Sequence, residues 1–230
     1  FTMIKKFMLL VLLSSFLGVH AQSWDFEKPD YKKIEKNIKK ENSNFYYSDL
    51  MDRFAAADTT LTIEQRRHLY YGYTFQPEYD PYGRSGYEDS LRPMWSKDSL
   101  NESDYRTILK FSDSLLKQDP FSLEAMNMQL FANDMLNNNS AVANVSQKAE
   151  MIVETLMSSG NGVSKETAFY VINTSHEYQL LNVFGFQFGG EQSLIEHYDR
   201  LTLAENEQGV EALYFDVTPC LNHLNQMFDE

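Results

Sequence analysis

Apolar residues recur at helical spacing in the first part of the chain. Ile34 and Ile38 lie four residues apart within the segment 31–40, as on one face of a short helix. The segment 46–57 repeats this spacing. The segment 62–71 opens with Thr-Ile-Glu-Gln, the form of a capping box, in which two side chains satisfy free backbone N–H groups at a helix start. The pattern therefore predicts three consecutive helices.

The clearest helical periodicity lies in the middle of the chain. Ser103 is expected to cap a helix that ends at Asp119-Pro120, Ser122 to cap the next helix, and residues 141–157 to form a third. The short turns between them predict antiparallel packing. The Asp-Pro turn resembles the junction between units of tetratricopeptide-like proteins, although the chain shows no repeat of about 34 residues.

Beyond a Ser/Gly/Asn break at 158–162, runs of β-forming residues replace the helical pattern. Thr218-Pro219 then starts a short helix, with Leu221, Leu224 and Phe228 on one face. The pattern predicts an α+β fold: N-terminal tetratricopeptide-like antiparallel helices, a small mainly antiparallel β-sheet and a C-terminal helix. The segments expected in extended conformation are 168–172, 177–181, 184–188, 200–203 and 213–217.

The N-terminus has the form of a secretory signal peptide. Lys5-Lys6 precede an apolar stretch from Phe7 to Val19, and small residues end it, so cleavage is expected between Ala21 and Gln22. The stretch is shorter than the roughly 20 apolar residues of a membrane-spanning helix, although retention as an anchor is the alternative. We therefore expect a periplasmic or secreted protein without a transmembrane segment after cleavage. Its residues 22–230 are expected to form one α+β domain, helical over 22–162 and β-rich over 163–230.

Charge and cysteine content exclude several classes of protein. The 230 residues include 33 acidic and 20 basic side chains, for a net charge of −13, which argues against a nucleic-acid partner. The excess is greatest after Lys165, where Arg200 is the one basic residue among eleven acidic ones. The single cysteine, Cys220, cannot form an internal disulfide or a cysteine-based zinc site, and we expect it to pack as a small apolar side chain.

The sequence contains no recognisable catalytic motif. His176-Glu177 opens like a zinc-protease motif, but Leu180 stands where the second histidine would be needed. Nucleotide-binding glycine loops and the serine-hydrolase elbow are absent as well. The sequence therefore predicts no catalytic residue, no metal ligand and no cofactor.

The most distinctive segment is a tyrosine-rich loop, residues 70–83, which opens a long irregular stretch that runs to residue 100 with a short strand near 90–94. Aromatic faces beside carboxylates can stack sugar rings or hold an extended peptide. The alternative is that these rings pack as a lid over the helices. We expect Tyr70, Tyr71 and Tyr73 to pack inward, and Tyr79 and Tyr82, between prolines and glycine, to be exposed. The residues predicted to bind a ligand are Tyr73, Gln76, Tyr79, Tyr82, His176 and Glu177.

Three segments resemble a family of uncharacterised proteins exported by Bacteroidota, known as a domain of unknown function. They are Leu69-Tyr70-Tyr71-Gly72-Tyr73 with Gln76, Ala168-Phe169-Tyr170-Val171-Ile172 with His176-Glu177-Tyr178, and Leu213-Tyr214-Phe215-Asp216-Val217. The resemblance covers most of the chain after the signal peptide and implies export, but no activity. The first hypothesis is thus a non-catalytic binding or scaffold protein of the bacterial envelope, with an envelope protein, a peptide or a glycan as partner. The alternative is a hydrolase acting on glycan or peptide.

Overall fold

The computed structural model describes residues 26–83, 94, 97 and 99–229. Contacts between backbone positions divide these residues into two compact units. One contains the described residues of 83–150, and the other contains 26–82 together with 151–229. Each unit is described by itself below.

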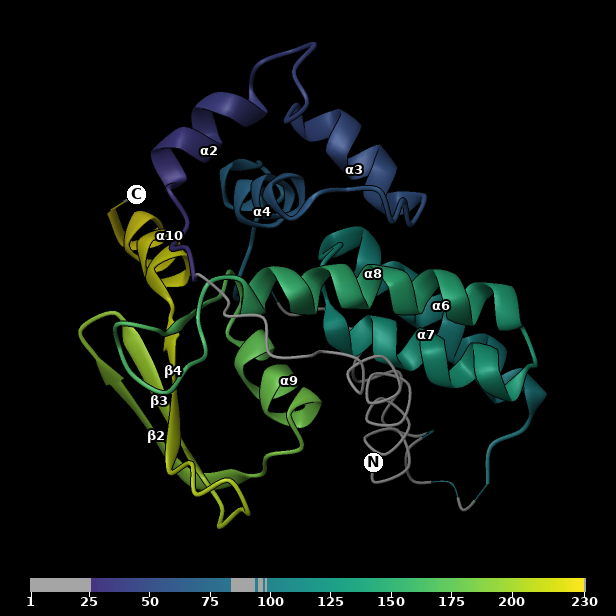
Figure 1. Ribbon diagram of the computed structural model, residues 1–230. Coiled ribbons are helices and arrows are strands. Elements are labelled where there is room, and N and C mark those ends of the chain that lie inside the picture. The colour runs from purple at the N-terminus through teal and green to yellow at the C-terminus, as the bar shows by residue number, and fades with distance from the viewer. Residues whose placement is uncertain (1–25, 84–93, 95–96, 98, 230) are drawn as a thin grey trace. The chain divides into compact units, whose positions relative to one another are not determined.

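The discontinuous unit begins with three short helices, α2 (Tyr31–Ile38), α3 (Tyr47–Ala55) and α4 (Ile63–Gly72), followed by a 3-10 turn, η1 (Tyr73–Phe75). Helices α2 and α3 both contact α4 (Figure 1). The predicted capping box is present: the side chain of Thr62 accepts from Gln65 N–H, and the Gln65 side chain accepts from Thr62 N–H. The predicted apolar stripes, including Ile34 and Ile38, are buried.

The second half of this unit carries a mixed sheet in the order β1-β4-β3-β2. Strand β1 pairs parallel with β4, whereas β4, β3 and β2 are antiparallel neighbours, which confirms the mainly antiparallel sheet. The strands are β1 (Phe169–Tyr170), β2 (Phe188–Ile195), β3 (Tyr198–Leu203) and β4 (Ala212–Asp216). The two apolar runs at 168–172 and 213–217 therefore meet in the sheet, as the β1–β4 pair.

We expected the segment 177–181 to be a strand, but this prediction is wrong. The segment lies within helix α9 (Ser175–Val183). The helix ends in a Schellman motif: Gly185, at φ +75°, donates to Asn182 O, and Phe186 N–H donates to Leu181 O. The glycine in Phe-Gly-Phe is therefore a helix-terminating residue and not part of a strand. The next strand begins only at Phe188, because the cap occupies the preceding residues.

The other unit contains helices α6 (Glu102–Gln118) and α7 (Leu123–Met135), and the first part of α8 (Asn139–Met157). The cap of α6 is Asn101 rather than Ser103, because the Asn101 side chain accepts from the N–H groups of Ser103 and Asp104. Ser122 caps α7 as predicted. Most of the strand expected at 90–94 lies outside the described residues. The tetratricopeptide likeness stays a prediction.

The chain ends in α10 (Thr218–Asp229), the predicted C-terminal helix. Its first turn is anchored by Cys220, which is fully buried as expected. Phe228, the last residue of the predicted apolar face, is 80% exposed. Within the described part of the chain, no helix combines the length and apolar character needed to cross a bilayer.

Candidate functional site

The start of the tyrosine-rich loop packs inward, as expected. Tyr70 and Tyr71 belong to α4, and Tyr73 follows in η1; all three side chains are buried. The Tyr71 hydroxyl donates to Tyr170 O over 3.4 Å, and the Tyr73 hydroxyl donates to Glu78 O over 3.2 Å. These rings therefore join α4 to the sheet and fix the path of the loop.

Tyr79 is not exposed, which corrects the prediction made from its proline and glycine neighbours. It is only 8% exposed, and its hydroxyl donates to Ile172 O over 2.8 Å. Its ring stands edge-on to Tyr73 and to His223, with centroids 5.7 and 5.5 Å away. Burial raises the pKa of Tyr79, so the hydroxyl stays protonated. Turn residues predict where the chain bends, but not which side chain the bend directs inward.

Two further predicted residues stay at the surface of the loop. Tyr82 is 39% exposed, as expected. The side-chain amide of Gln76 donates to Gly72 O over 3.1 Å and so helps to close the end of α4. This hydrogen bond gives Gln76 a structural role at the end of the helix, which the sequence pattern did not indicate.

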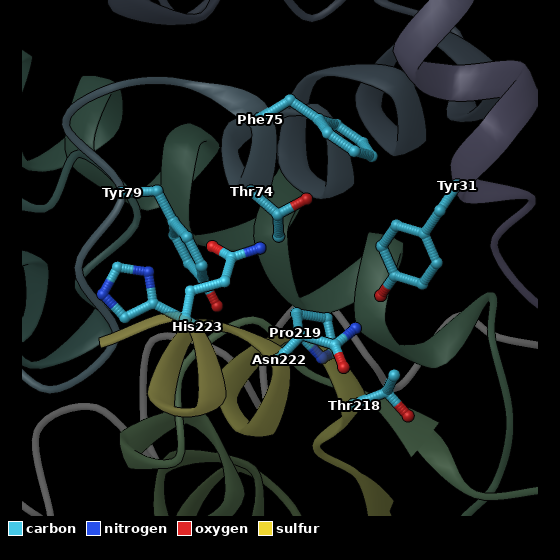
Figure 2. Close-up of a pocket in the computed structure, with 9 residues that line it drawn as sticks. Tyr31, Thr74, Phe75, Tyr79, Thr218, Pro219, Asn222 and His223 are labelled. Carbon is cyan, nitrogen blue, oxygen red and sulfur yellow. The ribbon is translucent and has the colours of Figure 1, made fainter. Parts of the chain in front are cut away.

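A cavity of about 230 Å³ opens between the loop, α2 and α10. Figure 2 shows the rings of Tyr31, Phe75 and Tyr79 around it, above the side chains at the start of α10. The side chains of Thr74, Asn222 and Gln226 add hydroxyl and amide groups to the lining. Among the described lining residues, His223 is the one titratable side chain besides the two tyrosines; its Nε2 atom lies 3.9 Å from Asp80. The cavity thus combines aromatic surface with mainly neutral hydrogen-bonding groups.

The Tyr31 hydroxyl is the most informative group in this cavity. It is buried and makes no hydrogen bond with any described residue. Burial raises its pKa well above the usual value, so the group is a neutral O–H at physiological pH. A buried hydroxyl without a partner is costly, and native proteins satisfy nearly all such groups. A polar ligand in the cavity would provide that partner.

Sequence analysis missed the contribution of α10 to this cavity. Thr218, Asn222 and Gln226 follow one another at intervals of four residues and form a polar stripe. This spacing is a recognisable signal, since residues i, i+4 and i+8 share one face of a helix. In contrast, the sequence around Tyr31 contains no pattern that would predict its place in the cavity.

His176 and Glu177 both lie on α9 and are fully buried. Nδ1 of His176 and the hydroxyl of Tyr70 are joined by a hydrogen bond of 2.7 Å. Neither residue lines the cavity of Figure 2, nor do Gln76 and Tyr82; of the six predicted residues, Tyr79 lines it and Tyr73 packs against Tyr79. The structure therefore separates the histidine and the glutamate from the cavity beside the loop.

Glu177 forms a buried carboxyl pair with Asp199 of β3. Burial, together with the negative charge of Asp199, raises the pKa of Glu177 to about 9. No described donor reaches either carboxyl oxygen of Glu177 or Oδ1 of Asp199. A protonated Glu177 resolves this, because its O–H can donate to Asp199. Glu177 therefore holds a proton at neutral pH.

A second, larger cavity of about 420 Å³ lies in the same unit and is strongly apolar. The amides of Asn161 and Gln208 are the polar side chains among its described lining residues, which leaves few groups to orient a polar ligand. The apolar lining includes Phe26, Phe169, Phe184, Phe186 and Leu213. Among the described residues, no group of three or more His, Cys, Asp or Glu side chains could hold a metal ion.

Helices, a four-stranded mixed sheet and a C-terminal helix define an α+β protein. The chain matches the family described as Domain of unknown function (DUF4919) over residues 32–226, and it belongs to that family. Comparisons with curated proteins and with solved structures found no match. The family assignment supports the resemblance seen in the tyrosine-rich loop and in the two β-forming runs.

Proposed function

We propose that this protein is a non-catalytic binding protein, exported to the envelope of a Bacteroidota cell, and that it holds a small neutral hydroxyl-bearing ligand such as one sugar unit of a glycan. The observation that carries the proposal is the buried, unpartnered Tyr31 hydroxyl in the cavity between the loop and α10. A ligand hydroxyl would satisfy it without bringing a charge into the cavity.

The rest of the lining supports the same ligand class. Phe75 and Tyr79 offer flat apolar surface for a ring, and Asn222 and Gln226 offer amide donors and acceptors around its edge. Among the described residues, the lining contains no lysine, arginine, aspartate or glutamate, so it offers no such side chain to neutralise an ionic ligand. The volume of about 230 Å³ suits one small ring better than an extended chain.

The hydrolase hypothesis has less support. It requires His176 and Glu177 to reach a substrate, yet both side chains are fully buried on α9. His176 is bonded to Tyr70, and the Glu177 carboxyl faces Asp199. A peptide or a protein as partner of the cavity is also less well supported, because the lining lacks charged groups and the volume is small.

Titration calorimetry and saturation-transfer NMR with glucose, galactose and N-acetylglucosamine test the proposal. Tyr31→Phe removes only the hydroxyl and is expected to weaken binding of the best sugar at least tenfold. It should not lower thermal stability, because the hydroxyl that it removes is buried without a partner. Asn222→Ala should also weaken binding, whereas Asn225→Ala, on the same helix but outside the lining, is the matched control. Failure of all three sugars to bind, or equal affinity for parent and Tyr31→Phe, would contradict the proposal.

Export is tested separately. The proposed cleavage between Ala21 and Gln22 predicts that the protein is released from cells by osmotic shock or found in the medium, with Gln22 as its first residue. N-terminal mass spectrometry of the protein from its native host measures this directly. Recovery of the uncleaved apolar segment in the membrane pellet would indicate an anchor instead.

A further inference from the structure

The sheet of the discontinuous unit has one long open edge. Strand β2 is the last strand in the order β1-β4-β3-β2, and no other strand among the described residues pairs with its outer side. Each of its eight residues, Phe188–Ile195, is exposed. Phe188, Leu194 and Ile195 are among the large apolar side chains that remain accessible. An edge of this kind is a template for an additional strand.

The backbone groups that face outward can be derived from the pairing register. Leu203 N–H of β3 donates to Glu211 O on the β4 side, so the alternate residues Arg200 and Thr202 direct their backbone groups toward β2. Arg200 is opposite Ser193, which therefore faces β3. The N–H and C=O groups of Gln192 and Leu194, on either side of Ser193, consequently point away from the sheet.

The edge is protected over only part of its length. The register shifts between Phe188 and Gln192, and this irregularity discourages pairing with another strand there. From Gln192 to Ile195 the register is regular and the residues carry neither charge nor proline. This stretch is also held in place, because the Gln192 side chain accepts from the Tyr178 hydroxyl over 2.6 Å and donates to Asp199.

The surroundings of this edge are acidic. Residues 188–216 contain seven acidic side chains and one basic one, Arg200. Exposed Glu191 lies in the strand itself, and exposed Glu205 and Glu207 follow β3. The end of β3 lies beside the start of β2, because Ala204 N–H donates to Gln187 O. Glu196, beyond the other end of β2, is paired with Lys165 at 3.3 Å. A strand added to this edge would therefore meet a net negative field.

We infer that the Gln192–Ile195 edge of β2 binds an extended basic peptide segment by strand addition. Main-chain hydrogen bonds to Gln192 and Leu194 hold the peptide, and its lysine or arginine side chains face the acidic surroundings. A second copy of this chain is the less suitable occupant, because two acidic edges would lie side by side. This surface is separate from the cavity of Figure 2, to which β2 contributes no residue.

A fluorescein-labelled heptapeptide of alternating lysine and valine is the probe, and the same peptide with glutamate in place of lysine is its control. Fluorescence anisotropy should show binding of the lysine peptide only, weakening as salt is added. Hydrogen exchange followed by NMR should show new protection at the amides of Gln192 and Leu194. The amides of Ser193 and Ile195, which face β3, should change little.

Four variants separate the contributions. Leu194→Pro removes the outward N–H and should weaken binding at least tenfold, whereas Leu194→Thr, which keeps the N–H and a β-forming side chain, should stay within threefold. Glu191→Gln should weaken binding and reduce its dependence on salt. Tyr31→Phe should leave peptide binding unchanged, so failure at the cavity and failure at the edge can be distinguished.

Several results would overturn the inference. Equal binding of the lysine and glutamate peptides would remove the charge argument. Binding without protection of Gln192 and Leu194, or undiminished in a folded Leu194→Pro variant, would place the peptide elsewhere. A dimer that forms through β2 as salt screens the acidic charges, detected by analytical ultracentrifugation, would make a second copy the occupant.

Discussion

At the scale of single residues, the carboxyl pair of Glu177 and Asp199 connects burial with pH dependence. The folded protein raises the pKa of Glu177 from its ordinary 4.5 to about 9. Between these two values the folded state holds a proton that the unfolded chain releases. The free energy of unfolding therefore decreases as the pH rises from about 4.5 toward about 9.

Glu177→Gln is predicted to remove this pH dependence. Glutamine is neutral at every pH and can donate to Asp199 as the protonated glutamate does. The variant should match the parent near pH 5 and exceed its melting temperature at pH 8, with the difference growing by at most about 1.4 kcal/mol per pH unit. Thermal melts across this range measure the effect. Parallel pH profiles for the two proteins would show that Glu177 is already ionised in the fold.

Tyr79 and Tyr82 lie in opposite environments, since Tyr79 is buried and Tyr82 is exposed. Tyr79→Ala removes a buried ring and is predicted to cost about 3 kcal/mol or more. This corresponds to a decrease of roughly 6–12 °C in melting temperature for a protein of this size. Tyr82→Ala removes a partly exposed ring and should cost much less. Similar melting temperatures for the two variants would contradict the inward orientation of Tyr79.

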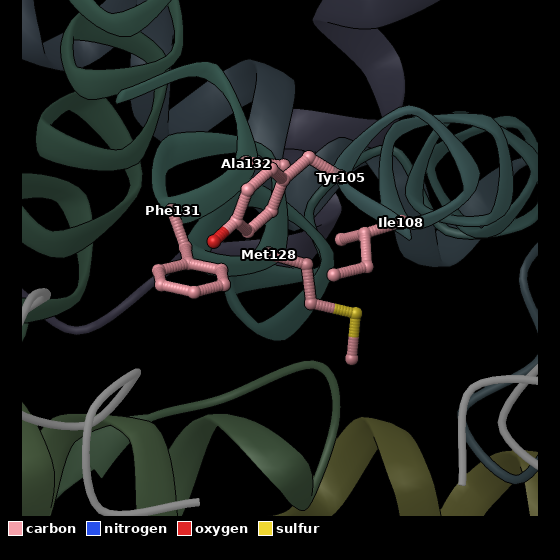
Figure 3. Close-up of a cluster of buried hydrophobic side chains, with 5 residues drawn as sticks. All are labelled: Tyr105, Ile108, Met128, Phe131 and Ala132. Atoms are coloured by element: carbon pink, nitrogen blue, oxygen red, sulfur yellow. The ribbon is translucent and has the colours of Figure 1, made fainter. Parts of the chain in front are cut away.

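At the scale of elements, helices α6 and α7 share a compact apolar cluster. Figure 3 shows Tyr105 and Ile108 of α6 beside Met128, Phe131 and Ala132 of α7. The rings of Tyr105 and Phe131 meet edge to face at 5.8 Å. Ile108 is fully buried in this cluster, so its side chain has no contact with water.

Ile108→Ala is predicted to destabilise the unit formed by residues 83–150. Truncating a fully buried isoleucine leaves a cavity and costs about 2–5 kcal/mol. Lys110→Ala, on the exposed side of the same helix, is the matched control and should change stability by less than about 0.5 kcal/mol. Denaturant unfolding, followed by circular dichroism, measures both variants. A small effect of Ile108→Ala would mean that the cluster collapses around the shorter side chain.

At the scale of the whole molecule, one unit is built from two distant segments. Hydrogen bonds and an ion pair connect residues of 26–82 with residues of 151–229. Tyr79 donates to Ile172 O, Arg67 donates to the Ser158 hydroxyl, and Arg66 pairs with Glu154. We therefore expect the N-terminal helices and the sheet to unfold together.

A chain shortened to residues 22–162 is predicted to lose this structure. Without the sheet, the rings of Tyr70, Tyr71 and Tyr79 would be exposed to water, and the amides of α4 should exchange rapidly with solvent. Shortening the chain after Gln226 instead removes the exposed side chains of Met227 and Phe228 and should leave α4 protected. Hydrogen exchange measured by mass spectrometry compares the two. Persistent protection of α4 in the 22–162 chain would show that the N-terminal helices fold alone.

Local interactions made much of the architecture predictable from the sequence. The capping box at Thr62, the cap at Ser122 and the stripe of Ile34 and Ile38 each involve residues within a turn or two of one another, and all were confirmed. The runs at 168–172 and 213–217 were expected in extended conformation, and each contributes a strand to the sheet, β1 and β4. The helix at 175–183 was missed, because a short apolar run suits a helix or a strand until its terminating glycine is recognised.

The candidate site depended on tertiary structure instead. The sequence alone determined the α+β architecture, the acidic C-terminal segment and the aromatic character of the loop. Only the folded chain brings Tyr31, Phe75 and Asn222 around one cavity, and only the folded chain turns Tyr79 inward. The physical reason is that helix caps and amphipathic stripes depend on neighbours in sequence. The surroundings of a buried hydroxyl, in contrast, depend on segments nearly 200 residues apart, such as Tyr31 and α10.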